Sequence, residues 1–294
     1  CDNIMNKKKA DKCKESLAIM LEHIQMNAKN ILLFNTVIGE IDHLDSATLD
    51  DFAAFNKKFH VPNNAVLVIA GDIQIDKTKK LVEKYFGDIK TGNRIERNFP
   101  AENPITETKF RTAYDENIQI PAKVLAYRTP SMKTKDSRVL DMISTYLSDG
   151  QSSVLYKKLV DDKKMALEVF ASNSSLEDYG FYWIGGLPIG ETELSELTTE
   201  IDEEIDKLKN ELISERDYNK IQNIFESLYV SQNSTVEGIA NSLARYHMLY
   251  GDVNLINTEI EIYRSITRKD IQNVAKKYLN KNQRFELEYL PKNN

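Results

Sequence analysis

The sequence predicts an α+β fold, α/β sandwich-like, in which a mixed sheet carries helices mainly on one face and the unit is built twice. Three observations predict it. Apolar runs of strand length alternate with amphipathic helical segments. Residues Thr48–Asp72 have the order of a capped helix, a turn and a strand. The same order returns at Thr267–Leu290, which indicates two related domains.

The first copy begins with a helix that Thr48 caps, and Asp51 at the third helical position gives an acidic variant of the capping box. Three aromatic residues at helical spacing form its apolar face: Phe52, Phe55 and Phe59. Residues 62–64, Pro-Asn-Asn, end the helix and turn the chain. The unbroken apolar run Ala65–Ala70 predicts a strand that is covered on both faces.

A constant offset relates the second copy to the first. Asp51 corresponds to Asp270, an offset of 270 − 51 = 219 residues. Thr48 then corresponds to Thr267, and the basic pair, the aromatic position and the turn match without a gap. We interpret this as an internal duplication, with two unrelated helix-turn-strand units as the alternative.

The remaining elements follow in order. Residues 11–29 predict a helix with an apolar stripe of Leu17, Met20, Leu21 and Ile24. A second helix ends at Gly87, and Pro and Gly residues then mark a linker. We therefore expect an incomplete first domain at 1–95, a linker at 96–108 and a second domain at 109–294.

The second domain is expected to contain strands near 109–117 and 119–128, helices from Ser137 and near Ser152, and a hairpin of 167–172 with 180–189. Three long helices follow. The first has apolar residues at steps of three and four, and the other two open with capping boxes at Ser214 and Ser234. The final strand is expected at 285–290.

Composition excludes several classes of protein. A chain of 294 residues with 41% hydrophobic content suits a globular protein of two domains. The sequence contains no run of 18 apolar residues, so no transmembrane segment is predicted. A net charge of −6 argues against nucleic acid as the main partner. Two cysteines, Cys1 and Cys13, make no disulfide framework. Cys1 is read either as the start of a mature lipoprotein, which favours the bacterial periplasm or cell envelope, or as an arbitrary boundary.

Two segments resemble one family. They are similar to segments of the M16 (pitrilysin, inverzincin) metallopeptidases. The first is VIGEIDHLDSATLDDF with the following VPNNAVLVIAGD, and the second is DGQSSVLYKKLVDDKKMALEV at Asp149–Val169. The resemblance covers almost everything after about Val37. It implies LuxS/metallohydrolase-like domains, two of which form half of a clam-shell that closes around an unfolded peptide. It also implies zinc held by His-x-x-Glu-His and a distant Glu.

The zinc motif itself is absent, because no two of the four histidines are four residues apart. In one register SLAIMLEHIQMNAKN is similar to the family's zinc helix, with Ile19 replacing the first histidine, Glu22 at the general-base position and His23 at the second ligand position. In the other register this helix is the one that precedes the Val-Ile-Gly segment, and the Glu22-His23 pair is a coincidence. In both registers we expect no stably bound zinc in this chain.

A second family feature is also replaced. Val160 and Leu167 stand where the resemblance implies an Arg and a Tyr that contact the substrate backbone, so both are assigned to the substrate chamber. The alternative is that they are core residues of a helix and the following strand. Ser152 and Ser153 are explained by helix capping rather than by hydrolase chemistry.

The resulting functional hypothesis is a portion or subunit of an M16 zinc metalloendopeptidase that forms the peptide-binding chamber. The alternative is a catalytically inactive, peptidase-like scaffold subunit. This chain alone is expected to be inactive. The expected partners are an unfolded peptide or protein substrate and a second M16-like subunit or a second copy of the chain, with no nucleic acid.

Overall fold

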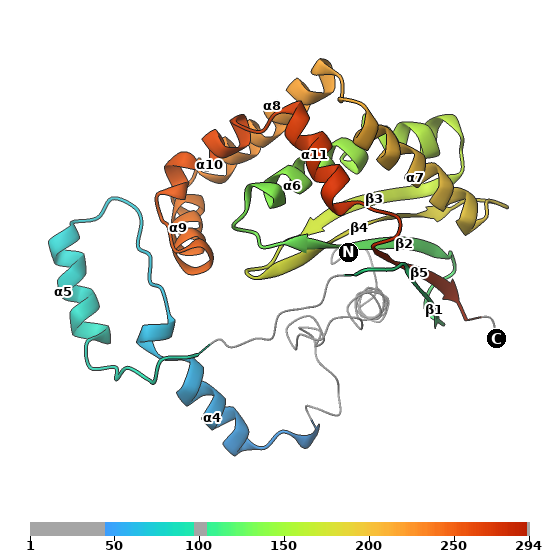
Figure 1. Cartoon of the computed structure of the whole chain (residues 1–294). Helices are drawn as coiled ribbons and strands as arrows, with labels where there is room; N and C mark the ends of the chain where they lie inside the picture. Colours follow the sequence, from blue (N-terminus) through green and yellow to red (C-terminus); the bar gives the residue numbers. More distant parts are fainter. Residues whose placement is uncertain (1–44, 97–104, 293–294) are drawn as a thin grey trace. The chain divides into compact units, whose positions relative to one another are not determined.

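The computed structural model describes residues 45–96 and 105–292 (Figure 1). The chain divides into two compact units. The described part of the first, here called the sheet unit, lies within Ala101–Ile224 and Glu261–Asn294. The described part of the second, here called the helical unit, lies within Ile38–Pro100 and Phe225–Ile260. The predicted linker at 96–108 is largely outside the described residues.

The sheet unit is built on five strands in the order β1-β5-β2-β4-β3. Their bounds are β1 Lys109–Asp115, β2 Ala122–Pro130, β3 Ala166–Ser174, β4 Tyr179–Pro188 and β5 Arg284–Pro291. The C-terminal strand β5 lies between β1, to which it is parallel, and β2, to which it is antiparallel. The β2–β4 and β3–β4 pairs are antiparallel. The sheet is therefore mixed, as predicted.

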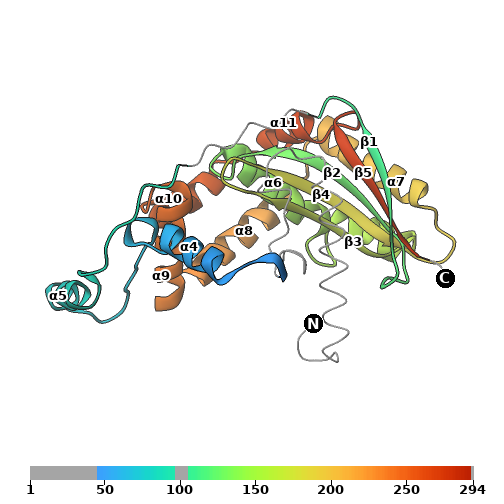
Figure 2. The same cartoon turned by 90° about the horizontal axis from the view of Figure 1, so that it is seen from below.

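Three helices lie on one face of this sheet: α6 Lys135–Ser148, α7 Leu194–Asn210 and α11 Arg268–Tyr278 (Figures 1 and 2). Strand residues Leu125 and Ile184 are fully buried beneath them. The apolar stripe of α7 supplies Leu197, Ile201, Ile205 and Leu208, which are all buried. The predicted fold class, an α+β arrangement with helices mainly on one face, is confirmed.

The helical unit contains α4 Leu49–Phe59, the short η1 turn Pro62–Asn64, α5 Ile75–Phe86, α9 Val236–Arg245 and η3 Tyr246–Tyr250. Helices α8 Glu215–Gln232 and α10 Leu255–Arg264 each continue from one unit into the other.

The predicted capping box at Ser234 is wrong, because the N-cap is Thr235, whose hydroxyl accepts from the Gly238 N–H. The third predicted helix is present from Val236, as α9 that runs directly into the π-type segment η3. It ends at Gly251, which is left-handed with φ 74° and separates η3 from α10. None of the described helices is long and apolar enough to cross a membrane.

The two copies of the internal repeat have the same local geometry. Helices α4 and α11 have 11 residues each and open with capping boxes at Thr48 and Thr267. The turn that follows is closed by Asn64 N–H to Val61 O in the first copy (2.9 Å) and by Gln283 N–H to Asn280 O in the second (3.0 Å). These bonds obey the same offset, 283 − 64 = 219, so the predicted helix and turn are confirmed in both copies.

The surroundings of the two copies differ. Residues 65–70 form no strand and have alternately exposed and half-buried side chains, so the prediction of a strand covered on both faces is wrong. The physical reason is that a strand needs a hydrogen-bonding neighbour, and the described part of the helical unit offers none. Helix α4 has no buried residue, whereas α11 buries Ile271, Gln272, Val274 and Ala275. Equivalence of whole domains therefore stays a prediction.

Candidate substrate-contacting edge

The structure places two of the four predicted site residues. Val160 lies half-buried in η2 (Tyr156–Asp162), a helical segment with π-type hydrogen bonds. Leu167 lies on β3 and is 52% exposed. The interpretation of both as core residues therefore fails for Leu167. Glu22 and His23 lie outside the described residues.

Leu167 occupies a β-bulge at the edge of the sheet. Ala166 pairs with Pro188 and Glu168 pairs with Leu187, so Leu167 is an extra residue on β3 with no partner on β4. Bulges at sheet edges redirect a side chain and increase the local twist. Leu167 therefore lies exposed at the end of an edge strand.

Farther along β3, a helix side chain occupies part of the same edge. The Ser148 hydroxyl at the end of α6 donates to the Ala171 carbonyl (3.1 Å) and accepts from the Ala171 N–H (2.7 Å). This one hydroxyl takes the place of a neighbouring strand, which is one way proteins protect sheet edges. Strand addition to β3 is thus opposed at Ala171, and the bulge at Leu167 interrupts the regular ladder at the other end of the strand. No feature of the sequence pattern indicated this role for Ser148.

An ion cluster anchors η2 to α7. The Lys158 ammonium lies 2.9 Å from Glu200 Oε2, 2.9 Å from Glu204 Oε1 and 3.0 Å from Glu203 Oε2. Burial alone would lower the pKa of Lys158, but the hydrogen bonds that its ammonium donates to these carboxylates outweigh burial and raise it. Burial likewise opposes ionisation of Glu200, yet bonds with Lys163 and Lys158 keep its pKa below the usual value. The cluster therefore stays charged and ties η2, the segment that contains Val160, to α7.

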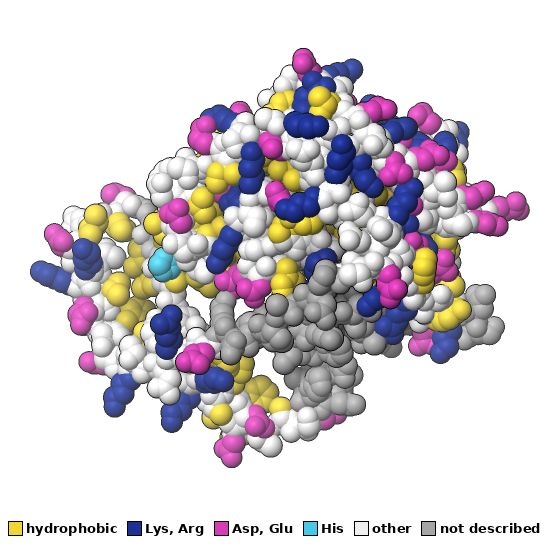
Figure 3. All heavy atoms as spheres, viewed as in Figure 1, with side chains coloured by type: hydrophobic (Ala, Val, Ile, Leu, Met, Phe, Trp, Pro, Cys, Tyr) yellow, Lys and Arg dark blue, Asp and Glu magenta, His cyan; other side chains and the backbone are white. Residues whose placement is uncertain are grey.

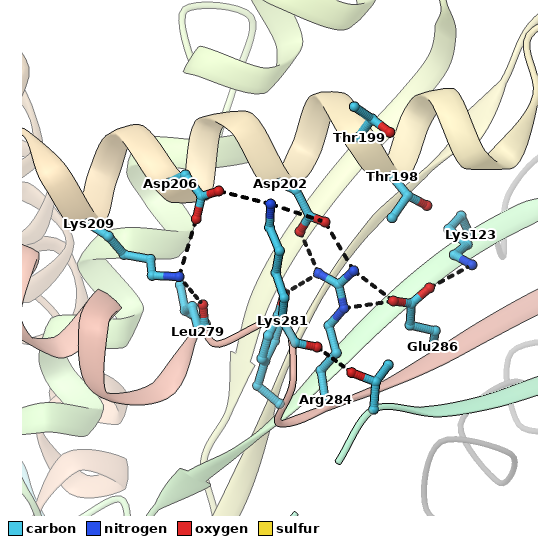
Figure 4. A network of polar contacts seen from close by, with 12 residues as sticks. Lys123, Thr198, Thr199, Asp202, Asp206, Lys209, Leu279, Lys281, Arg284 and Glu286 are labelled. Carbon is cyan, nitrogen blue, oxygen red and sulfur yellow. Dashed lines mark hydrogen bonds and ion pairs between the residues drawn. The ribbon is translucent and has the colours of Figure 1, made fainter. Parts of the chain in front are cut away.

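A second, buried network fastens α7 to the sheet (Figure 4). The Arg284 guanidinium on β5 bonds both oxygens of Asp202 on α7 and lies 2.7 Å from Glu286 Oε1. Lys123 on β2 lies 3.0 Å from the other oxygen of Glu286. Burial raises the pKa of Glu286, but hydrogen bonds from Lys123 and Arg284 dominate and lower it. The carboxylates and cations of this network satisfy one another, which is the arrangement of a structural tie rather than of a reacting site.

The described residues do not fit a zinc site. None of the clusters of His, Cys, Asp and Glu in residues 45–96 and 105–292 brings together three potential ligands. His60 is engaged locally, with its Nδ1 2.8 Å from Asn56 Nδ2 and its ring against Phe55. No catalytic step through zinc is therefore assigned to this part of the chain.

An open, largely apolar hollow lies along α4 in the helical unit. Its volume is about 570 Å³, and the described residues that line it include Phe52, Phe55, Asn56 and His60. By the offset of 219, Phe52 and Phe55 correspond to the buried Ile271 and Val274 of α11. Hydrophobic side chains also gather on the surface around α5 (Figure 3), where Leu81, Tyr85 and Phe86 are exposed.

Comparison with known proteins agrees with this fold. Residues 46–225, more than half of the chain, match the family model described as the peptidase M16 inactive domain. The chain belongs to the peptidase M16 family. It is 27% identical over 247 residues to the zinc protease PqqE of Helicobacter pylori, which covers 83% of this chain and 55% of the relative. This member therefore spans about half the length of that curated relative.

Solved structures share the same fold. A protease from Helicobacter pylori has a TM-score of 0.80 at 22% identity and matches 97% of this chain and 73% of its own. A chain of complex III2 from Candida albicans has a TM-score of 0.76 at 14% identity and matches 98% of this chain and 72% of its own. The sequence-based assignment to the M16 metallopeptidases is thus confirmed, and zinc belongs to the family through relatives named zinc proteases.

Proposed function

We propose that this chain forms part of the wall of a peptide chamber in an M16 zinc peptidase and binds no zinc stably itself. The observation that carries the proposal is the match of residues 46–225 to the M16 inactive domain, in a structure whose described residues bring no metal ligands together. The proposed domains are an incomplete first domain at 1–95, a linker at 96–108 and a second domain at 109–294.

The unpacked faces of the helical unit support an incomplete first domain. Phe52 is 59% exposed and Phe55 is 56% exposed, although their repeat equivalents are core residues of the sheet unit. Residues 65–70 are likewise apolar and have no strand partner among the described residues. A complete domain of this design would place a sheet and further helices against both features.

Substrate contact is proposed at the β3 edge, through the outward Leu167 and the adjoining η2 with Val160. Extended peptides add to exposed strand edges through backbone hydrogen bonds. Such a contact recognises the backbone of the peptide rather than its amino-acid sequence. Because the Ser148 hydroxyl bonds the backbone of Ala171, the contact is expected to be short and to involve the exposed Leu167 side chain more than a regular backbone ladder. Glu22 as general base and His23 as metal ligand are retained only for the register in which residues 11–29 are a degenerate zinc helix.

The proposed partners are an unfolded peptide and a second M16-like subunit or a second copy of this chain. The similar fold of a chain in complex III2, a multi-subunit assembly, supports a role among partners. The alternative function, a catalytically inactive scaffold, is favoured by Val160 and Leu167 standing in place of the Arg and Tyr.

The test is cleavage of an unfolded test polypeptide by the pure chain, alone and with an M16 partner that carries an intact His-x-x-Glu-His. We expect no cleavage by the chain alone and chelator-sensitive cleavage with the partner, above that of the partner alone. Substituting Leu167→Asp should weaken this stimulation, and the matched Leu212→Asp, at an exposed leucine distant in sequence, should not. Robust cleavage by the chain alone would contradict the proposal, and no stimulation by any such partner would favour the scaffold.

A further inference from the structure

The two edges of the sheet are built differently. At one edge, β3 carries the bulge at Leu167 and the Ser148 hydroxyl on the backbone of Ala171. At the other edge, β1 is the outermost strand on the β5 side (Figure 2). It pairs with β5 in an unbroken register from Lys109 to Asp115, with no bulge and no proline. A regular edge strand of this kind offers its outer backbone groups to a further strand.

One hydrogen bond shows which backbone groups of β1 face outward. The Asp115 carbonyl accepts from the Lys292 N–H just beyond β5 (2.9 Å), so the backbone polar groups of Asp115 point toward β5. This direction alternates from one residue to the next along a strand. The N–H and C=O groups of Phe110, Thr112 and Tyr114 therefore point away from β5. The described part of the chain places no further strand beside them.

The side chains of these three residues are exposed as well. Phe110 is 73% exposed, Tyr114 is 62% exposed, and Thr112 between them is also exposed. Aromatic residues are enriched where one protein surface contacts another. We call Phe110, Thr112 and Tyr114 the β1 edge, because they present both outward backbone groups and aromatic side chains to a second chain.

The β1 edge is complementary to itself. When two copies lie antiparallel with Thr112 opposite Thr112, Phe110 of each copy faces Tyr114 of the other, since both are two residues from the centre. Directly opposed residues of this kind exchange N–H···O=C bonds in both directions, so every outward backbone group of the three residues has a partner. Opposed side chains project to the same side, which gives two aromatic cross-strand pairs, a stabilising contact in sheets.

The charges of β1 suit the same register. Lys109 faces Asp115 of the second copy, and Arg111 faces Ala113, so no two like charges are directly opposed. A parallel alignment in register would place Lys109 against Lys109 and Asp115 against Asp115, which is unfavourable. A two-fold axis makes identical strands antiparallel, and such axes are the commonest symmetry of homodimers.

We propose that two copies of this chain associate through β1, residues 109–115, and join their sheets into one continuous sheet across a two-fold axis. The partner is thus the second copy already named among the proposed partners, and the inference rests on the proposed function in that respect alone. Neither the β3 edge nor zinc takes part in this contact.

Sedimentation velocity of the pure chain of residues 1–294, without substrate, tests the contact over a series of concentrations. We expect a monomer–dimer equilibrium. Thr112→Pro removes an outward N–H from the centre of the interface, and an edge strand tolerates a proline whose nitrogen faces outward. Dimerisation should become weaker by about ten-fold or more, because each copy loses a hydrogen bond. The matched Thr112→Val keeps the N–H and the branched shape, and should dimerise as the parent does.

Two double variants test the register. Phe110→Lys with Tyr114→Lys opposes lysine to lysine in both cross-strand pairs and should be monomeric. Phe110→Lys with Tyr114→Glu opposes lysine to glutamate in both pairs and should dimerise. Within one chain these positions are about 13 Å apart along the strand, so the sign of the second charge matters mainly between copies. Circular dichroism checks the fold of each variant, and this comparison decides the matter if Thr112→Pro unfolds the chain.

Three results would overturn the proposal. They are a parent chain that stays monomeric throughout the series, a dimer that folded Thr112→Pro leaves unchanged, and equal association of the two double variants. Slower hydrogen exchange of the Thr112 amide on adding an unfolded polypeptide to a monomeric parent would assign the β1 edge to peptide binding instead. Because the association is measured without substrate or a zinc-bearing partner, its failure leaves the proposed role in the peptide chamber standing.

Discussion

A pair of matched substitutions tests whether the two repeat copies sit in different surroundings. Ile271 on α11 is 1% exposed, and its equivalent Phe52 on α4 is 59% exposed. Truncating a buried Ile to Ala removes apolar contacts and leaves a cavity, which costs about 2–5 kcal/mol. A surface substitution away from such contacts changes stability by about 0.5 kcal/mol or less. Ile271→Ala should therefore destabilise the chain by several-fold more than Phe52→Ala.

The assay is urea unfolding followed by far-ultraviolet circular dichroism, which reports on both units, with Trp183 fluorescence as a second probe of the sheet unit. Two probes are needed because a chain with two units need not unfold in one step. We expect a lower midpoint in both signals for Ile271→Ala and unchanged midpoints for Phe52→Ala. Equal destabilisation by the two substitutions would refute the reasoning, since Phe52 would then have to be packed as tightly as its repeat equivalent.

Three further predictions concern the sheet. Ser148→Ala should lower the free energy of unfolding by about 1–3 kcal/mol, because the backbone N–H and carbonyl of Ala171 lose their hydrogen bonds to the Ser148 hydroxyl. The Ala171 amide should then exchange its hydrogen faster. An unchanged exchange rate would contradict the assignment of Ser148 to the sheet edge. Glu286 has a lowered pKa in the folded state, so its contribution to stability is present above its ordinary pKa of 4.5 and is lost as pH falls through the lower folded value. Denaturation against pH should therefore show Glu286→Gln removing part of the acid-induced loss, and an unaltered pH profile would contradict this. Leu167→Asp should change the free energy of unfolding by about 0.5 kcal/mol or less, because this side chain points outward. Val169→Asp, on the buried side of β3, should cost several times more. Equal costs of the two substitutions in thermal denaturation would place Leu167 in the core.

Local sequence signals predicted the local structure well. The Thr48 and Thr267 capping boxes and the apolar stripe of α7 depend on residues three or four apart, and the structure contains each of them. The strand expected at residues 65–70 failed for the opposite reason. A strand is stable only beside another strand, and an apolar run alone does not say whether that neighbour is present.

The candidate site was predicted only in part, for a similar reason. The family resemblance pointed to Val160 and Leu167, but the bulge that turns Leu167 outward depends on the register between β3 and β4. The Ser148 bonds to Ala171 and the tie between Arg284 and Asp202 join residues far apart in the chain. Such contacts follow from the topology of the sheet, which short-range patterns do not encode.

The most direct test of the central claim is the zinc content of the pure chain of residues 1–294, measured by elemental analysis after exposure to excess zinc and desalting. Much less than one zinc per chain is expected, because one His and one Glu are too few ligands for a tetrahedral site. Ile19→His should not produce a full site, since a third protein ligand is still lacking. One zinc per chain that disappears in His23→Ala would contradict the claim and would place this chain among the active, metal-loaded peptidases.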